Sequence, residues 1–255
     1  MSAPARRCLW LVPTPLDFGC ATQVPLQDVL PEATLAQAAQ LTHWITENAK
    51  TTRAFLKRVA ESHALALPLQ EQVITELPRQ VHKKGDLASG LDARPLLQAL
   101  PDGVDVGLVS EAGMPAVADP GSSVVRAAHD LGWRVAPLVG PVSLLLSLAA
   151  SGLNGQQFAF VGYLPQDAQE RIARIRQLEQ TALRTGQTQL WIETPYRNAA
   201  MLEALLKALQ PGTRLCVASG LTLATAESRS ASVQAWRLAP LGPDGHTPAV
   251  FAIGA

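Results

Sequence analysis

The most constraining feature of this sequence is a short apolar run that stops in a loop of small residues and prolines. Residues 106–109 read VGLV, and residues 110–121 continue as SEAGMPAVADPG. An open α/β sheet presents its backbone to a ligand in such loops, at the point where a strand ends. Gly113 lets a ligand approach the main chain closely, because glycine adopts positive φ angles and carries no side chain. The alternative interpretation is an ordinary strand–turn–helix connection. In either case, Asp119 is expected to cap a helix over about 121–131.

The composition predicts a folded protein without membrane segments. Hydrophobic residues make up 47% of the 255 residues and charged residues 16%, which suits a substantial core in one large or two medium domains. No apolar run approaches the roughly 18 residues of a membrane helix, and we expect no secretory signal. Three widely spaced cysteines, Cys8, Cys20 and Cys216, indicate reduced thiols in a cytoplasmic protein and no metal site. The 21 basic and 21 acidic residues balance, so RNA binding would need a local basic patch.

The first half of the chain alternates apolar strands with helical patterns, which is typical of a parallel α/β sheet. Strands are predicted at residues 9–13, 41–45, 73–77, 106–109 and 135–139. Helices are predicted from Thr46 or Glu47 onward and over 87–100, whereas residues 27–30 carry only a weak helical pattern. The helix after the second strand contains a dense basic cluster, which is either a solvated helix face or a functional patch. Its members are Lys50, Arg53, Lys57 and Arg58.

A second α/β pattern follows, and we predict domains over residues 1–140 and 141–255. Residues 144–151 are apolar nearly all round, which predicts a buried helix. The remaining predicted elements are strands at 158–161, 189–192, 214–218, 232–236 and 249–253, and helices at 169–183 and 199–209. The last two strands have no helical pattern between them, so we expect them to pair antiparallel.

Five groups of residues match, in order, the motifs of one enzyme family. They are LWLVPTPL at 9–16, VGLVSEAGMPAVADPG at 106–121, PLVGPVSLLLSLAASGL at 137–153, FAFVGYLP with WIETPYR at 158–165 and 191–197, and TPAVFAIGA at 247–255. With these motifs the chain resembles the tetrapyrrole methylase superfamily, the class III S-adenosylmethionine-dependent methyltransferases. It is most similar to the ribosomal RNA small-subunit methyltransferase I branch, which methylates a cytidine ribose 2′-oxygen.

The resemblance implies two α/β domains of the tetrapyrrole methylase type, with S-adenosyl-L-methionine bound in the crevice between them and a homodimer as the assembly. The family's donor-binding positions map mostly onto small residues and prolines: Pro15, Ala112, Gly113, Met114, Pro115, Val117, Ala118, Val142, Ser143, Glu193, Gly220 and Leu221. An RNA ribose acceptor must also lose a proton, so a base or a nearby cation is expected. The candidates for that role are Glu47, Lys50 and Glu111, with Glu193 and Arg197 considered beside them.

The chain departs from the branch at four places on the predicted acceptor side. Asp17-Phe18-Gly19 stands for Gly-Asn-Leu, Glu47-Asn48-Ala49-Lys50 for Glu-Asp-Thr-Arg, SGLTL at 219–223 for Arg-Glu-Leu-Thr-Lys, and Tyr196 for a histidine. Three functions therefore stay open. They are a methyltransferase acting on RNA, a methyltransferase of this fold acting on a tetrapyrrole or other small molecule, and a non-catalytic dimer that binds the donor or its product.

Overall fold

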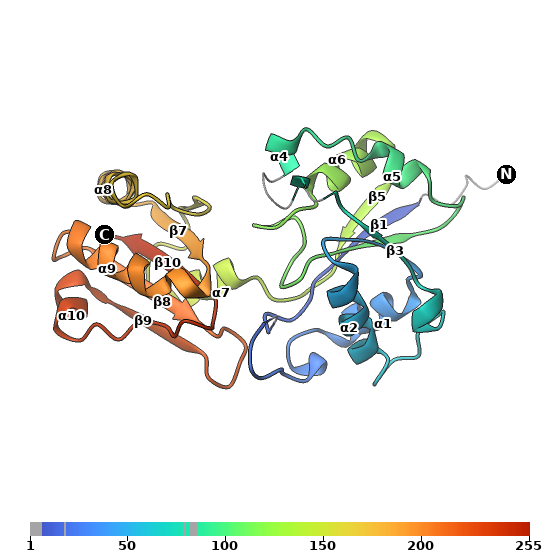
Figure 1. Ribbon diagram of the computed structural model, residues 1–255, viewed down its shortest axis with the longest axis horizontal. Coiled ribbons are helices and arrows are strands. Elements are labelled where there is room, and N and C mark those ends of the chain that lie inside the picture. Colours follow the sequence, from blue (N-terminus) through green and yellow to red (C-terminus); the bar gives the residue numbers. More distant parts are fainter. Residues whose placement is uncertain (1–6, 18, 79, 82–85) are drawn as a thin grey trace. The chain divides into compact units, whose positions relative to one another are not determined.

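The computed structural model describes residues 7–17, 19–78, 80–81 and 86–255, and these form two compact units (Figure 1). The first unit contains the described residues up to 17 and from 24 to 141, and the second contains residues 19–23 and 142–255. Each unit is built on one five-stranded sheet with helices, which confirms the predicted α/β class with two α/β units. Among the described residues, no helix combines the length and the apolar character that a membrane span requires.

The first unit holds a parallel sheet with the strand order β3-β2-β4-β1-β5. Its strands are β1 (Cys8–Val12), β2 (His43–Thr46), β3 (Val73–Glu76), β4 (Val106–Val109) and β5 (Arg134–Pro137), close to the five predicted runs. The central strand β4 pairs in parallel with β1 and with β2. The carboxyl ends of these three strands therefore lie along one edge of the sheet.

Helices cover both faces of this sheet. They are α1 (Glu32–Gln40), α2 (Ala49–Val59), α4 (Asp86–Ser89), α5 (Arg94–Gln98) and α6 (Ser122–Asp130). Leu108 of β4 packs in a core with residues of α5 and α6, whereas its neighbour Val109 packs in a core with residues of α1 and α2. The two cores alternate because successive strand residues point to opposite faces. A Cβ at Gly107 would lie 2.6 Å from the Trp44 ring, so this position requires a glycine.

Two helices near the start of the chain differ from the prediction. The basic helix α2 begins at Ala49 rather than at Thr46 or Glu47, because Asn48 caps it. The Asn48 Oδ1 accepts a hydrogen bond from the backbone N–H of Lys50 at 2.9 Å. The weak pattern over residues 27–30 forms only a 3-10 turn, and the longer helix α1 lies beyond it.

The prediction of one helix over residues 87–100 is wrong, because this stretch contains the two short helices α4 and α5. Gly90 has φ +63° and follows the end of α4, where a left-handed residue stops a helix. Pro95 lies in the first turn of α5, where its fixed φ angle and missing N–H are tolerated.

The prediction that Asp119 caps α6 is also wrong, because Asp86 performs this role. The Asp86 Oδ2 accepts hydrogen bonds from the backbone N–H groups of Gly121 at 2.9 Å and Ser123 at 2.7 Å. It also accepts hydrogen bonds from the hydroxyl groups of Ser122 and Ser123. Local sequence points to the nearest acid, whereas the fold supplies the cap from α4.

The second unit holds a mixed sheet with the strand order β6-β7-β10-β8-β9. Its strands are β6 (Phe158–Phe160), β7 (Thr188–Glu193), β8 (Arg214–Ser219), β9 (Glu227–Ser232) and β10 (Ala249–Gly254). Strand β6 runs parallel to β7, and the other pairs are antiparallel. One face packs against α8 (Ala168–Thr185), α9 (Asn198–Ala208) and α10 (Val233–Leu238), and the other face packs against α7 (Ser143–Ser151).

The predicted strand over residues 232–236 is wrong, because this stretch begins helix α10. The Ser232 hydroxyl caps α10 by accepting a hydrogen bond from the Ala235 N–H at 3.2 Å. Trp236 then reaches the core, and its indole N–H donates to the Leu215 carbonyl at 2.8 Å. The expected pairing of the last two strands is wrong as well, since β9 and β10 both pair with β8.

Helix α7 is buried on one face only, although its sequence is apolar nearly all round. Leu144 and Leu148 pack against β7, β8 and β10, whereas Leu145 is 51% exposed and Leu146 38% exposed. The prediction of a fully buried helix is therefore only half correct.

Candidate functional site

A backbone bridge between Thr14 and Gly113 joins the loops that follow β1 and β4. The Thr14 N–H donates to the Gly113 carbonyl at 3.0 Å, and the Gly113 N–H donates to the Thr14 carbonyl at 3.1 Å. The Thr14 hydroxyl also donates to the Ser110 carbonyl at 3.3 Å. Pro15 therefore lies beside the central loop, which we define as residues 110–121.

The central loop has a crowded and strained backbone. Gly113 has φ +77°, and a Cβ there would lie 3.1 Å from Leu16 Cδ2. Ala116 and Ala118 both have φ 64°, a left-handed conformation that costs a residue with a side chain about 1–2 kcal/mol. Such strain persists only where surrounding contacts hold it, and it clusters at functional loops. The loop therefore presents its backbone groups in one fixed arrangement.

The predicted donor residues of this loop divide into supporting and accessible ones. Gly113 and Pro115 are buried, and both polar backbone groups of Gly113 bond to Thr14. These two residues position the loop. The half-buried or exposed residues that a ligand can reach are Ala112, Met114, Val117 and Ala118.

A buried hydroxyl group without a partner lies at the start of the central loop. The Ser110 residue is 5% exposed, and its Oγ forms no hydrogen bond with any described residue. A buried polar group left in this state costs about 1–3 kcal/mol, which a ligand or a water molecule can recover. No sequence pattern distinguishes Ser110 from other loop serines, so only the structure identifies it.

The charges of two other carboxyl groups act on Asp119 of the central loop. Glu47 follows β2, and Glu111 follows β4 and accepts a hydrogen bond from the Asn48 amide at 3.0 Å. Burial, together with the negative charges of Glu47 and Glu111, raises the pKa of Asp119 from 3.8 to about 7. Two predicted catalytic residues thus act electrostatically on a third acid, which the sequence analysis had assigned to a helix cap. Within the described residues, no three His, Cys, Asp or Glu side chains are arranged to hold a metal ion.

Lys50, the third predicted catalytic residue, is exposed in the first turn of α2. Arg53 and Lys57 are also exposed on this helix. Residues three, four and seven apart share one helix face, so these three cations line the same side of α2. We call Lys50, Arg53 and Lys57 the basic stripe.

The fourth member of the basic cluster, Arg58, has a structural partner. Its guanidinium donates to both carboxylate oxygens of Asp17, at 3.2 and 3.1 Å, and to the Val24 carbonyl at 2.6 Å. Asp17 is 3% exposed and departs from the family pattern. The departure therefore introduces a buried ion pair that ties the loop after β1 to helix α2. Phe18, the next residue of that pattern, lies outside the described residues.

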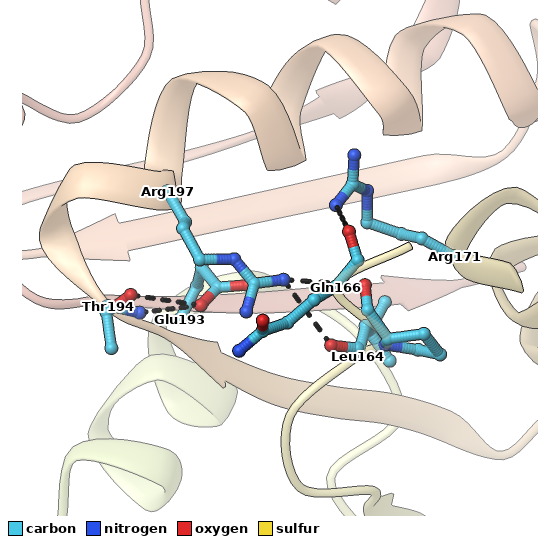
Figure 2. Close-up of polar contacts among 7 residues, drawn as sticks. Leu164, Gln166, Arg171, Glu193, Thr194 and Arg197 are labelled. Carbon is cyan, nitrogen blue, oxygen red and sulfur yellow. Dashed lines mark hydrogen bonds and ion pairs between the residues drawn. The ribbon is translucent and has the colours of Figure 1, made fainter. Parts of the chain in front are cut away.

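In the second unit, the predicted donor residue Glu193 is engaged within the protein (Figure 2). Its Oε1 accepts a hydrogen bond from the Thr194 N–H at 2.8 Å, and its Oε2 faces the Arg197 Nη2 at 3.1 Å as an ion pair. The same Nη2 lies 3.5 Å from the Leu164 carbonyl oxygen and 3.4 Å from that of Pro165. Glu193 is 2% exposed, so it joins the segments after β6 and β7 rather than presenting a carboxylate at the surface.

The remaining predicted donor residues of the second unit lie at element ends. Val142 is the N-cap residue of α7 and Ser143 its first residue. Gly220 and Leu221 follow β8, and Ala249 of β10 pairs with both Glu193 and Ser219. Glu193 and the turn that contains Gly220 and Leu221 therefore lie at the same edge of the second sheet.

The fold is that of a known methyltransferase. The crystal structure of the methyltransferase CobJ matches this chain with a TM-score of 0.52, over 99% of this chain and 94% of the other. The two sequences are 18% identical, so this likeness defines the fold class alone.

The sequence is similar to ribosomal RNA small subunit methyltransferase I from several bacteria, which confirms the resemblance carried by the motifs. The protein of Mesorhizobium japonicum is 36% identical over 140 residues, which cover 55% of this chain and 46% of the relative. The protein of Micromonospora olivasterospora is 42% identical over 118 residues, which cover 46% of this chain and 36% of the relative. The protein of Vibrio cholerae is 32% identical over 130 residues, which cover 51% of this chain and 44% of the relative. The chain thus spans less than half of these curated relatives. No protein-family model matches it.

Proposed function

We propose that this protein is an S-adenosylmethionine-dependent methyltransferase that acts on RNA. The similarity to ribosomal RNA small subunit methyltransferase I supports both the activity and the acceptor. The carrying observation is the bridge between Thr14 and Gly113. It joins the two loops that the family resemblance assigns to the donor into one rigid edge of the first sheet.

The residues of that edge suit a polar, cationic cofactor. When bound, S-adenosylmethionine supplies an electrophilic methyl group on a positively charged sulfur. The accessible part of the central loop would hold it mainly through backbone groups, and the Ser110 hydroxyl has an unused hydrogen-bonding capacity. Pro15 is buried like Gly113 and Pro115, so it is assigned a supporting role beside the loop. Glu47 and Glu111 contribute negative charge, which favours a cation nearby.

The predicted donor residues of the second unit stay in the proposal with different roles. Val142, Ser143 and Leu221 lie at element ends, where backbone groups are available to a ligand. Gly220 is buried, and its carbonyl accepts a hydrogen bond from the Leu223 N–H at 2.8 Å, so it is assigned a role in shaping the turn. Glu193 is assigned a positioning role, because its carboxylate already contacts Thr194 and Arg197.

Asp119 is the proposed proton acceptor. A hydroxyl group must lose its proton when its oxygen receives a methyl group, and a base with a pKa near the working pH does this best. With a pKa of about 7, the Asp119 carboxyl group is partly ionised at neutral pH. Glu47 and Glu111 act on this proton through their charges.

The basic stripe of Lys50, Arg53 and Lys57 is the proposed contact for RNA phosphates. The chain is neutral overall, so any attraction to RNA must come from such a local group. Helix α2 starts directly after Asn48, whose amide binds Glu111, so the stripe begins next to the proposed acid–base group.

We also propose a cytoplasmic homodimer. The family resemblance supports the dimer, and light scattering after size-exclusion chromatography tests it, since the mass of a single chain would contradict it. Cys8 and Cys216 are buried, and burial raises the pKa of both thiols, that of Cys8 to about 11. Inert buried thiols of this kind suit a reducing compartment.

Calorimetry with S-adenosylmethionine and S-adenosylhomocysteine, followed by transfer of a radiolabelled methyl group, tests the proposed function. We expect donor binding to the wild-type protein and label in small-subunit ribosomal RNA. Label in a tetrapyrrole but in no RNA would favour the small-molecule alternative. Donor binding without transfer to either acceptor would favour a non-catalytic binding protein, and a folded protein that binds neither ligand would contradict the proposal.

A further inference from the structure

The exposed aromatic side chains among the described residues belong to strand β6 or to the segments that follow β6 and β7 in the second unit. They are Phe158, Phe160, Tyr163 and Tyr196, with exposed fractions of 42%, 37%, 57% and 77%. Strand β6 is at the edge of its sheet and precedes Tyr163, and Tyr196 follows the neighbouring strand β7. Single exposed apolar residues need no explanation, but a group confined to one part of a sheet indicates contact with a partner.

Tyr163 and Tyr196 are the two tyrosines of the chain, and both lie beyond the carboxyl ends of parallel neighbouring strands. The Ile192 N–H donates to the Gly162 carbonyl at 3.3 Å, so Tyr163 leaves the sheet beside the end of β7. Tyr196 follows within the 3-10 turn Pro195–Arg197. The two aromatic rings therefore come from adjacent strand ends.

The backbone that carries these rings is held in place by buried contacts (Figure 2). Tyr163 precedes Leu164, whose carbonyl oxygen contacts Arg197, and Tyr196 directly precedes Arg197. Arg197 in turn faces the buried carboxylate of Glu193 at 3.1 Å. Because this backbone is already fixed, little conformational entropy of the protein is lost when a ligand binds to the two rings.

The chain segment that carries these rings has more arginines than accessible acids. Between residues 158 and 197 the acidic side chains that solvent reaches are Asp167 and Glu170, because Glu179 and Glu193 are buried. The arginines of the same segment are Arg171, Arg174, Arg176, Arg184 and Arg197. The segment as a whole is therefore net basic, although the whole chain is neutral.

We propose that Tyr163 and Tyr196 form a stacking surface for the bases of single-stranded RNA, an inference that rests on the proposed RNA acceptor. Every base has a π-face, so tyrosine rings beside positive charge bind single strands with little sequence preference. Tyr196 stands where the family motif has a histidine, and the substitution enlarges the aromatic surface at this position. Glu193 and Arg197 act as positioning residues for the two rings.

Fluorescence anisotropy with a labelled, unstructured oligocytidine RNA tests the stacking surface in the full chain. Loss of one stacked base is worth about 1–3 kcal/mol, so Tyr163→Ala and Tyr196→Ala should each weaken binding roughly 5- to 150-fold. Tyr196→Phe should keep wild-type affinity, because the ring is retained. Phe158→Ala is the matched control and should keep wild-type affinity, because it removes an exposed aromatic ring at the start of β6, whereas Tyr163 lies beyond the end of this strand.

A second measurement separates stacking from a structural role. An RNA that contains 2-aminopurine should lose fluorescence on binding to the wild type and to Tyr196→Phe, but less on binding to Tyr196→Ala at saturating protein. Tyr163→Ala and Tyr196→Ala should bind S-adenosylmethionine as the wild type does. Equal RNA affinity of these variants and the wild type overturns the stacking surface and leaves the methyltransferase proposal intact. Absence of RNA binding by a wild-type protein that binds the donor overturns the stacking surface and the RNA acceptor together.

Discussion

Thr14 and Gly113 exchange a pair of backbone hydrogen bonds of 3.0 and 3.1 Å, which locks the loop after β1 to the loop after β4. The two strands are parallel neighbours, so the bridge continues their pairing beyond the sheet. We therefore expect a substitution in either loop to affect the position of the other. We expect the proposed binding of the methyl donor to depend on this bridge more than on any single side chain of the central loop.

Gly113→Ala should lower both stability and donor affinity. The added Cβ would sit at φ +77° and 3.1 Å from Leu16 Cδ2, so the substitution brings backbone strain and crowding together. The left-handed conformation alone costs about 1–2 kcal/mol for alanine. Urea unfolding measures the loss of stability, and calorimetry with S-adenosylmethionine measures the affinity.

Gly103→Ala provides the control for this substitution. Gly103 has nearly the same angle, φ +76°, but a Cβ added there would have no heavy atom within 4 Å beyond its chain neighbours. This variant should lose stability only by the cost of the left-handed conformation, and it should keep full donor affinity. Equal losses of donor affinity in both variants would contradict a special role for the bridge.

Removal of the helix cap from α6 should destabilise the first unit. Asp86→Ala deletes one acceptor that serves two backbone N–H groups and two hydroxyl groups, and we expect a loss of about 1–2 kcal/mol in the free energy of unfolding. Chemical denaturation measures the loss. Asp130→Ala, at the exposed C-terminal end of the same helix, should change stability by much less.

The Asp86 cap shows which features of the structure could be predicted from the sequence and which could not. Apolar runs and loop residues predicted the strands of the first sheet and the central loop, because these depend on neighbours in the chain. They did not reveal that Asp86 caps α6 or that Asp119 lies among charges, because both facts depend on contacts between distant segments. The strand predicted over residues 232–236 failed for the same reason. Ser232 caps a helix there, and the helix is favoured because Trp236 reaches the core, which depends on distant segments.

In the candidate site, too, the local motifs could be recognised from the sequence, whereas the partners of the charged side chains could not. Family motifs assigned the central loop, Pro15 and Glu193 to the donor site, and the structure places Pro15 beside that loop. The motifs could not show that Glu193 forms an ion pair with Arg197. They also could not show that Asp17, which stands for a family glycine, is buried and paired with Arg58. These outcomes depend on which partner each charge finds, and a linear pattern does not contain that information.

The ion pair between Asp17 and Arg58 should contribute strongly to stability. Asp17 is 3% exposed, and removal of one partner leaves a charge in a poorly solvated site. We expect Asp17→Ala and Arg58→Ala each to cost about 3 kcal/mol in urea unfolding. The double variant should lose less than the sum of the two, and strictly additive losses would show that the two side chains do not interact.

The basic stripe should determine how salt affects RNA binding. In the variant with Lys50→Gln, Arg53→Gln and Lys57→Gln, the slope of log affinity against log salt concentration should become shallower by about 2 for a single-stranded RNA. Anisotropy titrations at several salt concentrations measure it. The paired control Arg126→Gln and Lys207→Gln removes exposed cations elsewhere and should leave the slope unchanged.

The ionisation of Asp119 should make stability fall as pH rises through the weakly acidic range. Its pKa is raised from 3.8 to about 7, so below pH 3.8 the carboxyl group is protonated in both the folded and the unfolded chain. Between these values the unfolded chain releases the proton while the folded protein retains it, which favours unfolding progressively. Above pH 7 both states are ionised, and the penalty stays constant.

Asp119→Asn should remove this dependence, because the amide does not titrate. Its melting temperature relative to the wild type should therefore increase between about pH 4 and pH 7 and level off above pH 7. The same variant should lose methyl transfer while it retains donor binding, since the proposed proton acceptor is gone. Asp130→Asn, an exposed carboxyl group in α6, is the control for the loss of one charge. A constant difference in melting temperature across this pH range would show that Asp119 ionises normally, and the proposal that it accepts the proton would then fail.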